Sequence, residues 1–236
     1  MEDVHCIVPA RFQSSRFPGK PLVPICGRPM ILRTLDRALA AGCFKSVVCA
    51  TDDLRILKLV ESAGYRAVLT GKAVTGSDRV SEAAEKLGLN LVVNLQGDEP
   101  LADLRMLRDV SKALVEEPSS WITVAAPLAE KDRAAISVVK VLVDGSDYAR
   151  DFVRVLPERP EGWLRHVGVY AYSAEARAEF SNLPQSEKEK ERSLEQLRIL
   201  GKRPIRVVYC TSLSASVDLP SDVQKVETLL KQSGNL

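Results

Sequence analysis

The chain has 236 residues, of which 45% are hydrophobic, so it is long enough to bury a sizeable core as one domain. Its formal net charge of +2 argues against a nucleic-acid-binding surface, which needs clustered basic residues and a higher pI. No apolar run reaches membrane-spanning length, and the five cysteines include no CxxC pair. We therefore expect a cytoplasmic protein with reduced thiols and no nucleic-acid or membrane partner.

Strand and helix patterns alternate through the first half of the chain. An apolar strand over residues 4–10 precedes a helix that runs from Pro29 to Gly42. The next helix is predicted to be capped by Thr51 or Asp52. The remaining predictions are strands over residues 46–51, 65–70 and 89–96, a polar loop over residues 71–79 with a short helix after it, and a helix over residues 103–116. This alternation predicts an α/β fold with a doubly wound, mostly parallel sheet.

The second half is less regular and predicts a smaller antiparallel extension of the sheet. Its predicted strands cover residues 121–128, 137–143, 151–157, 164–173 and 205–210. Its predicted helices cover residues 174–180 and 187–200, and a last helix begins near Pro220.

The loop after the first strand suits a polyanion. It holds the cations Arg11, Arg16 and Lys20 together with Ser14, Ser15 and Gly19, and it contains no carboxylate. Backbone N–H groups and cationic side chains in such a loop can bind phosphate oxygens. Neither GxxxxGK[ST] nor GxGxxG is present. A solvated basic loop is the alternative interpretation.

A second polar segment, QGDEP, follows the apolar strand at residues 89–96. Ligands of open α/β sheets bind at the carboxyl ends of the strands, where this segment, the basic loop and residues 76–79 all lie. Asp98 could hold Mg²⁺ between phosphate oxygens there. The alternative is an ordinary Gly-Asp turn before a helix, with Glu99 favouring the helix N-terminus.

Two of these segments carry a resemblance to a known family. PARFQSSRFPGKPL resembles the nucleotide-binding signature of sugar-nucleotide cytidylyltransferases, and NLQGDEPL resembles the metal-binding segment of the 3-deoxy-manno-octulosonate (KDO) cytidylyltransferases. The resemblance implies a nucleotide-diphospho-sugar transferase fold in a single domain over residues 1–236. It also implies a nucleotide-binding half (1–128), an acceptor-binding and dimerisation half (129–236), and a homodimer.

The resemblance implies roles for particular residues on the nucleotide side. TGSDR at residues 75–79 resembles the family's SGTER segment, although Ala73 replaces a histidine usual in the family. SVDLPSDV stands where the family has GVDTPEDL, which implies that Asp218 joins Asp98 in binding Mg²⁺; a helix-capping role for Asp218 is compatible with this. The implied catalytic residues are Arg11, Lys20 and Asp98, and the implied CTP-binding residues are Pro9, Ala10, Arg11, Ser14, Arg16, Lys20, Ser77, Arg79 and Gln96.

On the acceptor side, LRHVGVYAY and SLEQLRIL resemble family segments that contact a carboxylated sugar. The implied acceptor-binding residues are Gln96, Arg154, His166, Tyr170, Glu195 and Gln196. A packed core histidine and a solvated charged helix are the alternative interpretations. Three departures from the family pattern lie on this side: DFVR replaces YFSR at residues 151–154, the segment up to Trp163 is shorter, and Arg192 replaces a glutamate.

The resemblance implies transfer of CMP from CTP to a 2-keto-3-deoxy sugar acid, KDO, with release of pyrophosphate in lipopolysaccharide or capsule precursor synthesis. One alternative is the same reaction on aminated KDO, another ulosonic acid or a phosphonate. A second is a catalytically silent nucleotide-binding homologue, against which the intact Lys20, Asp98 and Asp218 speak. A GTP- or UTP-dependent transferase is disfavoured because the LxAGxGxR opening of such enzymes is absent.

Overall fold

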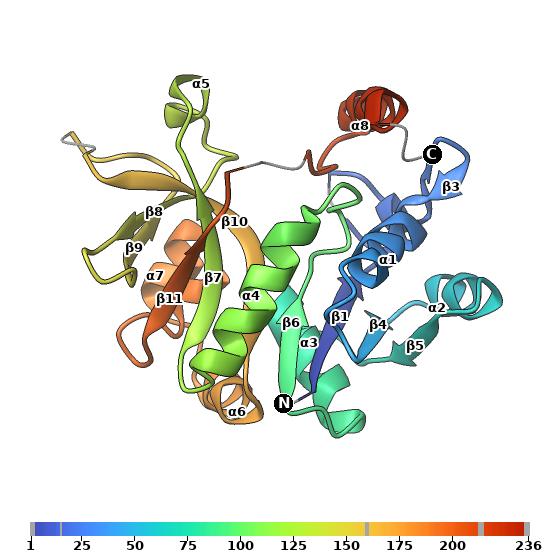
Figure 1. Cartoon of the computed structure of the whole chain (residues 1–236), viewed down its shortest axis with the longest axis horizontal. Helices are drawn as coiled ribbons and strands as arrows, with labels where there is room; N and C mark the ends of the chain where they lie inside the picture. Colours follow the sequence, from blue (N-terminus) through green and yellow to red (C-terminus); the bar gives the residue numbers. More distant parts are fainter. Residues whose placement is uncertain (1–2, 15, 159–160, 212–214, 234–236) are drawn as a thin grey trace.

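The computed structural model describes residues 3–14, 16–158, 161–211 and 215–233. A nine-stranded sheet forms its centre, with β11-β7-β10-β6-β1-β4-β5 as the order of hydrogen-bonded neighbours (Figure 1). Its strands are β1 (Val4–Ala10), β4 (Ser46–Thr51), β5 (Arg66–Leu69), β6 (Leu91–Asn94), β7 (Trp121–Ala126), β8 (Lys140–Val143), β9 (Ala149–Val153), β10 (Trp163–Tyr172) and β11 (Ile205–Tyr209).

The strand directions confirm the predicted α/β architecture. Strands β6, β1, β4 and β5 lie side by side in this order and run parallel to one another. Strand β11 runs parallel to β7. Strand β10 runs antiparallel between β6 and β7, and its far end pairs with β8, which pairs with β9. These three strands form the antiparallel extension expected in the second half. A separate two-stranded sheet joins β2 (Pro24–Ile25) to β3 (Arg28–Pro29).

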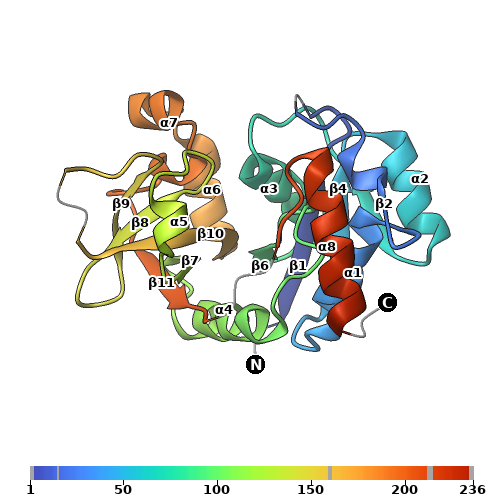
Figure 2. The same ribbon diagram turned by 90° about the horizontal axis from the view of Figure 1, so that it is seen from above.

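Helices cover both faces of the sheet, which explains why its central strands are apolar throughout. Helices α1 and α4 lie on one face, and α3 and α6 lie on the other (Figure 2). Helix α8 packs over β2, and its Val226 and Leu230 belong to the same buried hydrophobic cluster as Ile25. The helices are α1 (Met30–Ala40), α2 (Leu54–Ser62), α3 (Gly76–Lys86), α4 (Leu104–Glu116), α5 (Glu130–Arg133), α6 (Ala174–Asn182), α7 (Glu187–Arg192) and α8 (Pro220–Ser233), with the 3-10 turns η1 (Lys20–Leu22) and η2 (Glu195–Leu197).

Three sequence-based boundaries are wrong. Helix α2 is capped by Asp53, whose carboxylate accepts from Arg55 N, whereas Thr51 ends β4 and accepts from Asp53 N. Residues 76–79, predicted as loop, form the first turn of α3, because Thr75 and Asp78 make a capping box that starts the helix there.

The helix predicted over residues 187–200 is also broken. Helix α7 ends at Arg192, and Ser193 adopts a left-handed conformation (φ 52°) before η2 begins. The Arg154 guanidinium binds the carbonyls of Arg192 and Ser193, which a continuing helix would have used itself. The turn lets Leu194 bury against the core.

The predicted burial of Cys6, Cys49 and Cys210 is confirmed, and burial raises the pKa of each thiol. Among the described residues, no helix combines the length and apolar character needed to cross a membrane.

Candidate functional site

Lys20 lies at the centre of the first cluster. Its ammonium donates to Asp98 Oδ2 at 2.7 Å and to the Val217 carbonyl at 2.9 Å, and lies 3.7 Å from Asp218 Oδ1. Arg16 Nη2 reaches the same Asp218 oxygen at 3.1 Å. The basic loop and QGDEP therefore meet at the carboxyl end of the parallel strands, as expected from the sequence, and the segment that holds Val217 and Asp218 joins them there.

The backbone around Asp98 fixes this arrangement. Asp98 O accepts from Val217 N at 3.0 Å, which ties the segment before α8 to the turn after β6. A Cβ on Gly97 would lie 2.7 Å from the carbonyl oxygen of Pro9, so only glycine fits between β1 and this turn. Pro9 and Ala10 end β1, Arg11 is exposed immediately after it, and Ser14 accepts from Phe17 N inside the loop. Ser15 lies outside the described residues.

The two carboxylates beside Lys20 fit a hard divalent cation by their chemistry, since oxygen donors are what Mg²⁺ prefers. The described residues contain no group of three or more His, Cys, Asp or Glu side chains placed to hold a metal. Asp98 and Asp218 could hold such an ion only with further oxygens from a substrate, such as phosphate oxygens.

A second cluster lies at the N-terminus of α3. Ser77 donates from its backbone N and its hydroxyl to the carboxylate of Glu195 (3.2 and 3.0 Å). Arg198 binds Asp78 at 2.9 Å and Glu189 at 2.7 Å. The predicted nucleotide segment is thus joined to the predicted acceptor segment by the Arg198–Asp78 ion pair and by the hydrogen bonds between Ser77 and Glu195.

Gln96 lies between these clusters. Its amide donates to Asn94 Oδ1 at 3.0 Å, and Asn94 donates to Ser77 Oγ at 3.3 Å. Its side chain also lies against Gly76 and Gly168, whose ideal Cβ positions would fall 3.2 Å and 3.9 Å from it. Gln96 therefore contacts both the start of α3 and β10, which suits its predicted role between nucleotide and acceptor.

The aromatic residues of the predicted acceptor site gather on β10. His166 and Tyr170 lie with ring centroids 5.6 Å apart, and Tyr170 OH donates to Gln196 Oε1 at 3.1 Å. Burial lowers the pKa of His166 to about 3, and burial, reinforced by the charge of Glu195, raises the pKa of Tyr170. Gln196 Nε2 is buried and has no hydrogen-bond partner among the described residues, which is unusual for a buried polar atom.

Comparison with known proteins shows to which family the chain belongs. Residues 5–205 match the cytidylyltransferase family. A 3-deoxy-manno-octulosonate cytidylyltransferase from Anaeromyxobacter sp. (strain Fw109-5) is 42% identical over 98% of both chains, and one from Bdellovibrio bacteriovorus is 36% identical over 97% of this chain and 98% of its own. The chain belongs to the 3-deoxy-manno-octulosonate cytidylyltransferase family.

The solved structures agree. A CMP:2-keto-3-deoxy-manno-octonic acid synthetase in complex with CTP superposes with a TM-score of 0.92 at 34% identity, covering 98% of this chain and 100% of its own. A cytidylyltransferase from Leptospira borgpetersenii shares the fold (TM-score 0.68, 15% identity, covering 98% of this chain and 88% of its own). As a member of the family, the chain is a nucleotidyltransferase.

Arg79, Arg154 and Glu195 are predicted site residues whose charged groups bind other parts of the protein. Arg79, 3% exposed, donates to Asp52 at 2.8 Å and to Thr70 at 2.5 Å. Arg154 binds the carbonyls that end α7, and Glu195 binds Ser77. Their direct contacts with nucleotide or acceptor stay predictions; in this structure they hold neighbouring segments in place.

Three residues of the site have no counterpart in the sequence-based prediction: Asn94, Arg198 and Thr123, whose hydroxyl lies 2.9 Å from His166 Nε2. Asn94 and Thr123 are wholly buried polar residues inside apolar strands, which is the signal that could have found them. Arg198 gives no such signal, because an arginine in a charged segment is usually solvated.

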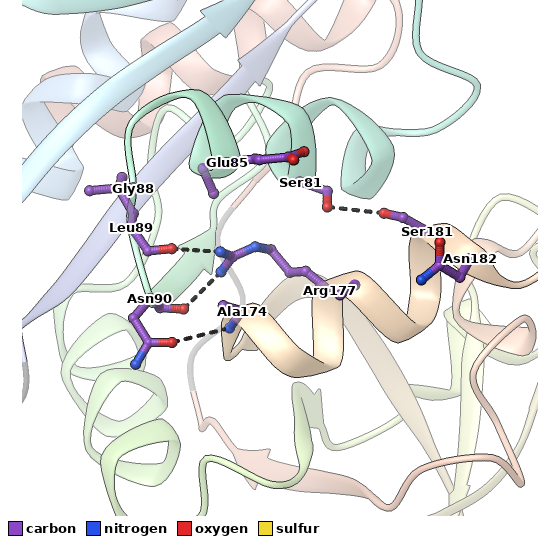
Figure 3. A pocket seen from close by; sticks show the side chains of 11 residues that line it. Ser81, Glu85, Gly88, Leu89, Asn90, Ala174, Arg177, Ser181 and Asn182 are labelled. Carbon is purple, nitrogen blue, oxygen red and sulfur yellow. Dashed lines mark hydrogen bonds between the residues drawn. The ribbon is translucent and has the colours of Figure 1, made fainter.

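A separate cavity of about 500 Å³ lies between α3 and α6, beside the amino end of β6 (Figure 3). The buried Arg177 guanidinium there donates to the carbonyls of Leu89 and Asn90 at 2.6 and 2.9 Å. None of the predicted site residues lines it. Asp98 follows the carboxyl end of β6, so this cavity belongs to the opposite end of the sheet.

The buried His166 predicts a pH-dependent stability. Its pKa is about 3 in the folded chain, against an ordinary 6.5, so between these values the unfolded chain binds the extra proton. The stability that neutral His166 contributes to the folded chain is therefore complete above pH 6.5 and is lost as the pH falls toward 3. In urea titrations, the stability advantage of the wild type over His166→Gln should shrink by about 2 kcal/mol between pH 6.5 and roughly 5.

The matched control is His5→Gln, because His5 is the other histidine and is only partly buried. Burial also lowers the pKa of His5, but the charge of Asp3 opposes this, so its pH effect should be smaller. A stability difference for His166→Gln that is constant across this pH range would contradict the neutral, buried state.

Proposed function

We propose that this chain transfers CMP from CTP to KDO and releases pyrophosphate. The observation that carries the proposal is the meeting of Lys20, Asp98 and Asp218 beside the basic loop. The names of the full-length relatives and of the CTP-bound structural neighbour support it.

In this proposal, the phosphates of CTP lie over residues 11–20. A sugar hydroxyl attacks the α-phosphorus; the new P–O bond forms as the bond to the β-phosphate oxygen breaks, and the hydroxyl proton leaves to solvent. Arg11, Arg16 and Lys20 neutralise the charge that builds on departing pyrophosphate. Mg²⁺, when bound by Asp98 and Asp218, would neutralise phosphate charge and align the reacting groups. Positioning and electrostatics are thus the protein's contribution, with no covalent intermediate.

The acceptor is proposed to lie against β10 and η2. Gln96, His166, Tyr170 and Gln196 offer hydrogen-bonding groups from adjacent segments, and the unpartnered Gln196 Nε2 suits a sugar oxygen. A small polyhydroxylated acid satisfies this mixture better than an apolar acceptor would.

The departures from the family pattern lie on the acceptor side and are the reason to keep other acids as alternative acceptors. Two of the altered positions are partners: Arg192 binds Asp151 at 2.8 Å and also donates to the Phe152 carbonyl. These contacts link β9 to α7 in this chain. We also expect a cytoplasmic homodimer whose product serves lipopolysaccharide or capsule synthesis.

A panel of acceptors tests which acid the enzyme uses as its substrate. Purified protein with CTP and Mg²⁺ would receive KDO, aminated KDO, another ulosonic acid or a phosphonate, and pyrophosphate release would be measured. We expect the highest kcat/KM with KDO and little turnover when UTP or GTP replaces CTP. A higher kcat/KM with another acid would reassign the acceptor, and no turnover with any acid while CTP binds would support the silent homologue.

A further inference from the structure

Thr123 lies on β7, next to His166 on the neighbouring strand β10. It is fully buried on β7, and its hydroxyl oxygen is 2.9 Å from His166 Nε2 and 3.1 Å from the carbonyl oxygen of Val169. One hydroxyl therefore contacts two groups, and it has a single proton to donate.

A β-bulge decides where that proton goes. The β7–β10 register pairs Val124 with Val167 and Thr123 with Tyr170, so Gly168 and Val169 have no residue opposite them on β7. The Val169 carbonyl can only accept, so a Thr123 hydroxyl that donated elsewhere would leave two oxygen lone pairs facing each other at 3.1 Å, which is repulsive. The Thr123 proton therefore points to Val169 O.

The tautomer of His166 follows from this. Because the Thr123 hydroxyl donates to Val169, it can only accept from His166, so the imidazole proton must lie on Nε2. Nδ1 then keeps its lone pair. It has no hydrogen-bond partner among the described residues, and His166 keeps 8% of its surface exposed, which leaves room for a ligand to approach the imidazole.

We propose that Thr123 is a positioning residue that holds neutral His166 with its proton on Nε2 and presents Nδ1 as a hydrogen-bond acceptor to a hydroxyl of the sugar. The inference rests on the proposed function and refines it. A neutral imidazole that accepts cannot bind a carboxylate, so His166 recognises a hydroxyl, and the sugar carboxylate must be held by other groups. The T-shaped contact with the Phe152 ring (5.1 Å) keeps the imidazole plane fixed.

The experiment combines nitrogen NMR of histidine with kinetics. The chain has only His5 and His166, so a His5→Gln background leaves one imidazole to observe. We expect the wild-type His166 spectrum to show a protonated Nε2 and an unprotonated Nδ1 at neutral pH. Protonation on Nδ1 would overturn the proposal whatever the enzyme's substrate is.

Two variants complete the test. Thr123→Val keeps the shape and removes the hydroxyl, whereas Thr123→Ser keeps the hydroxyl. In Thr123→Val, His166 should no longer be protonated on Nε2 alone, and the KM for the acceptor should rise about tenfold with the KM for CTP unchanged. Thr123→Ser should keep both the Nε2-protonated tautomer and the wild-type KM for the acceptor. An unchanged tautomer and acceptor KM in Thr123→Val would contradict the inference. Failure of the wild type to use any sugar acid would refute the proposed function alone, since the tautomer is read without turnover.

Discussion

Replacing Lys20 by methionine is expected to lower kcat/KM about 10²–10³-fold, as removal of one preorganised charge donor does in other enzymes. Lys20 is the cation that contacts both Asp98 and Asp218, and its side chain is only 14% exposed, so solvent cannot substitute for it. Pyrophosphate release at varied CTP and KDO measures the effect. Methionine keeps the length of the side chain, so the loss reports the missing charge.

Lys45→Met is the matched control. Lys45 has a 65% exposed side chain and a loose contact with Asp3 at 3.7 Å, so its variant should keep wild-type kinetics. Equal activity of Lys20→Met and the wild type would remove Lys20 from the reaction and reduce its ion pairs to a structural link.

Replacing Arg198 by methionine is expected to lower the free energy of unfolding by about 3–5 kcal/mol, because it leaves two carboxylates near each other without their cation. Burial by itself would lower the pKa of Arg198, yet the hydrogen bonds and charges of Glu189 and Asp78 raise it. The Arg198 side chain is 5% exposed and lies 4.0 Å from the centre of the Phe180 ring. Urea denaturation gives the size of the loss.

Arg105→Met serves as the control for arginine removal. Its side chain is 86% exposed and 3.7 Å from Asp109, so the change in stability should stay within about 0.5 kcal/mol. If Arg198→Met were as mild as this control, the buried ion pairs would not stabilise the junction between α3 and η2.

The elements that follow local rules could be predicted from the sequence. Apolar strands of the right length and glycine-terminated helices indicated the α/β fold, and the positions of Asp98 and the basic loop after strands placed both at one edge of the sheet. The parallel core and the antiparallel extension are present as expected.

Features that depend on tertiary contacts were not predictable in this way. The charged pattern from residue 187 to 200 favours one helix, but Arg154, remote in sequence, binds its carbonyls and Leu194 turns into the core. The loop assigned to residues 76–79 is helical because a capping box overrides the low helix propensity of glycine and serine. Thr123 and Arg198 gain their importance only from residues that the fold brings to them.

The most direct test of the central claim is metal-dependent pyrophosphate release from CTP and KDO by the wild type and by Asp98→Ala. We expect release by the wild type that requires Mg²⁺ and falls at least about 10³-fold in the variant, since both the proposed Mg²⁺ ligand and the partner of Lys20 are lost. Comparable release by Asp98→Ala would contradict the placement of the reaction at the Lys20–Asp98–Asp218 cluster.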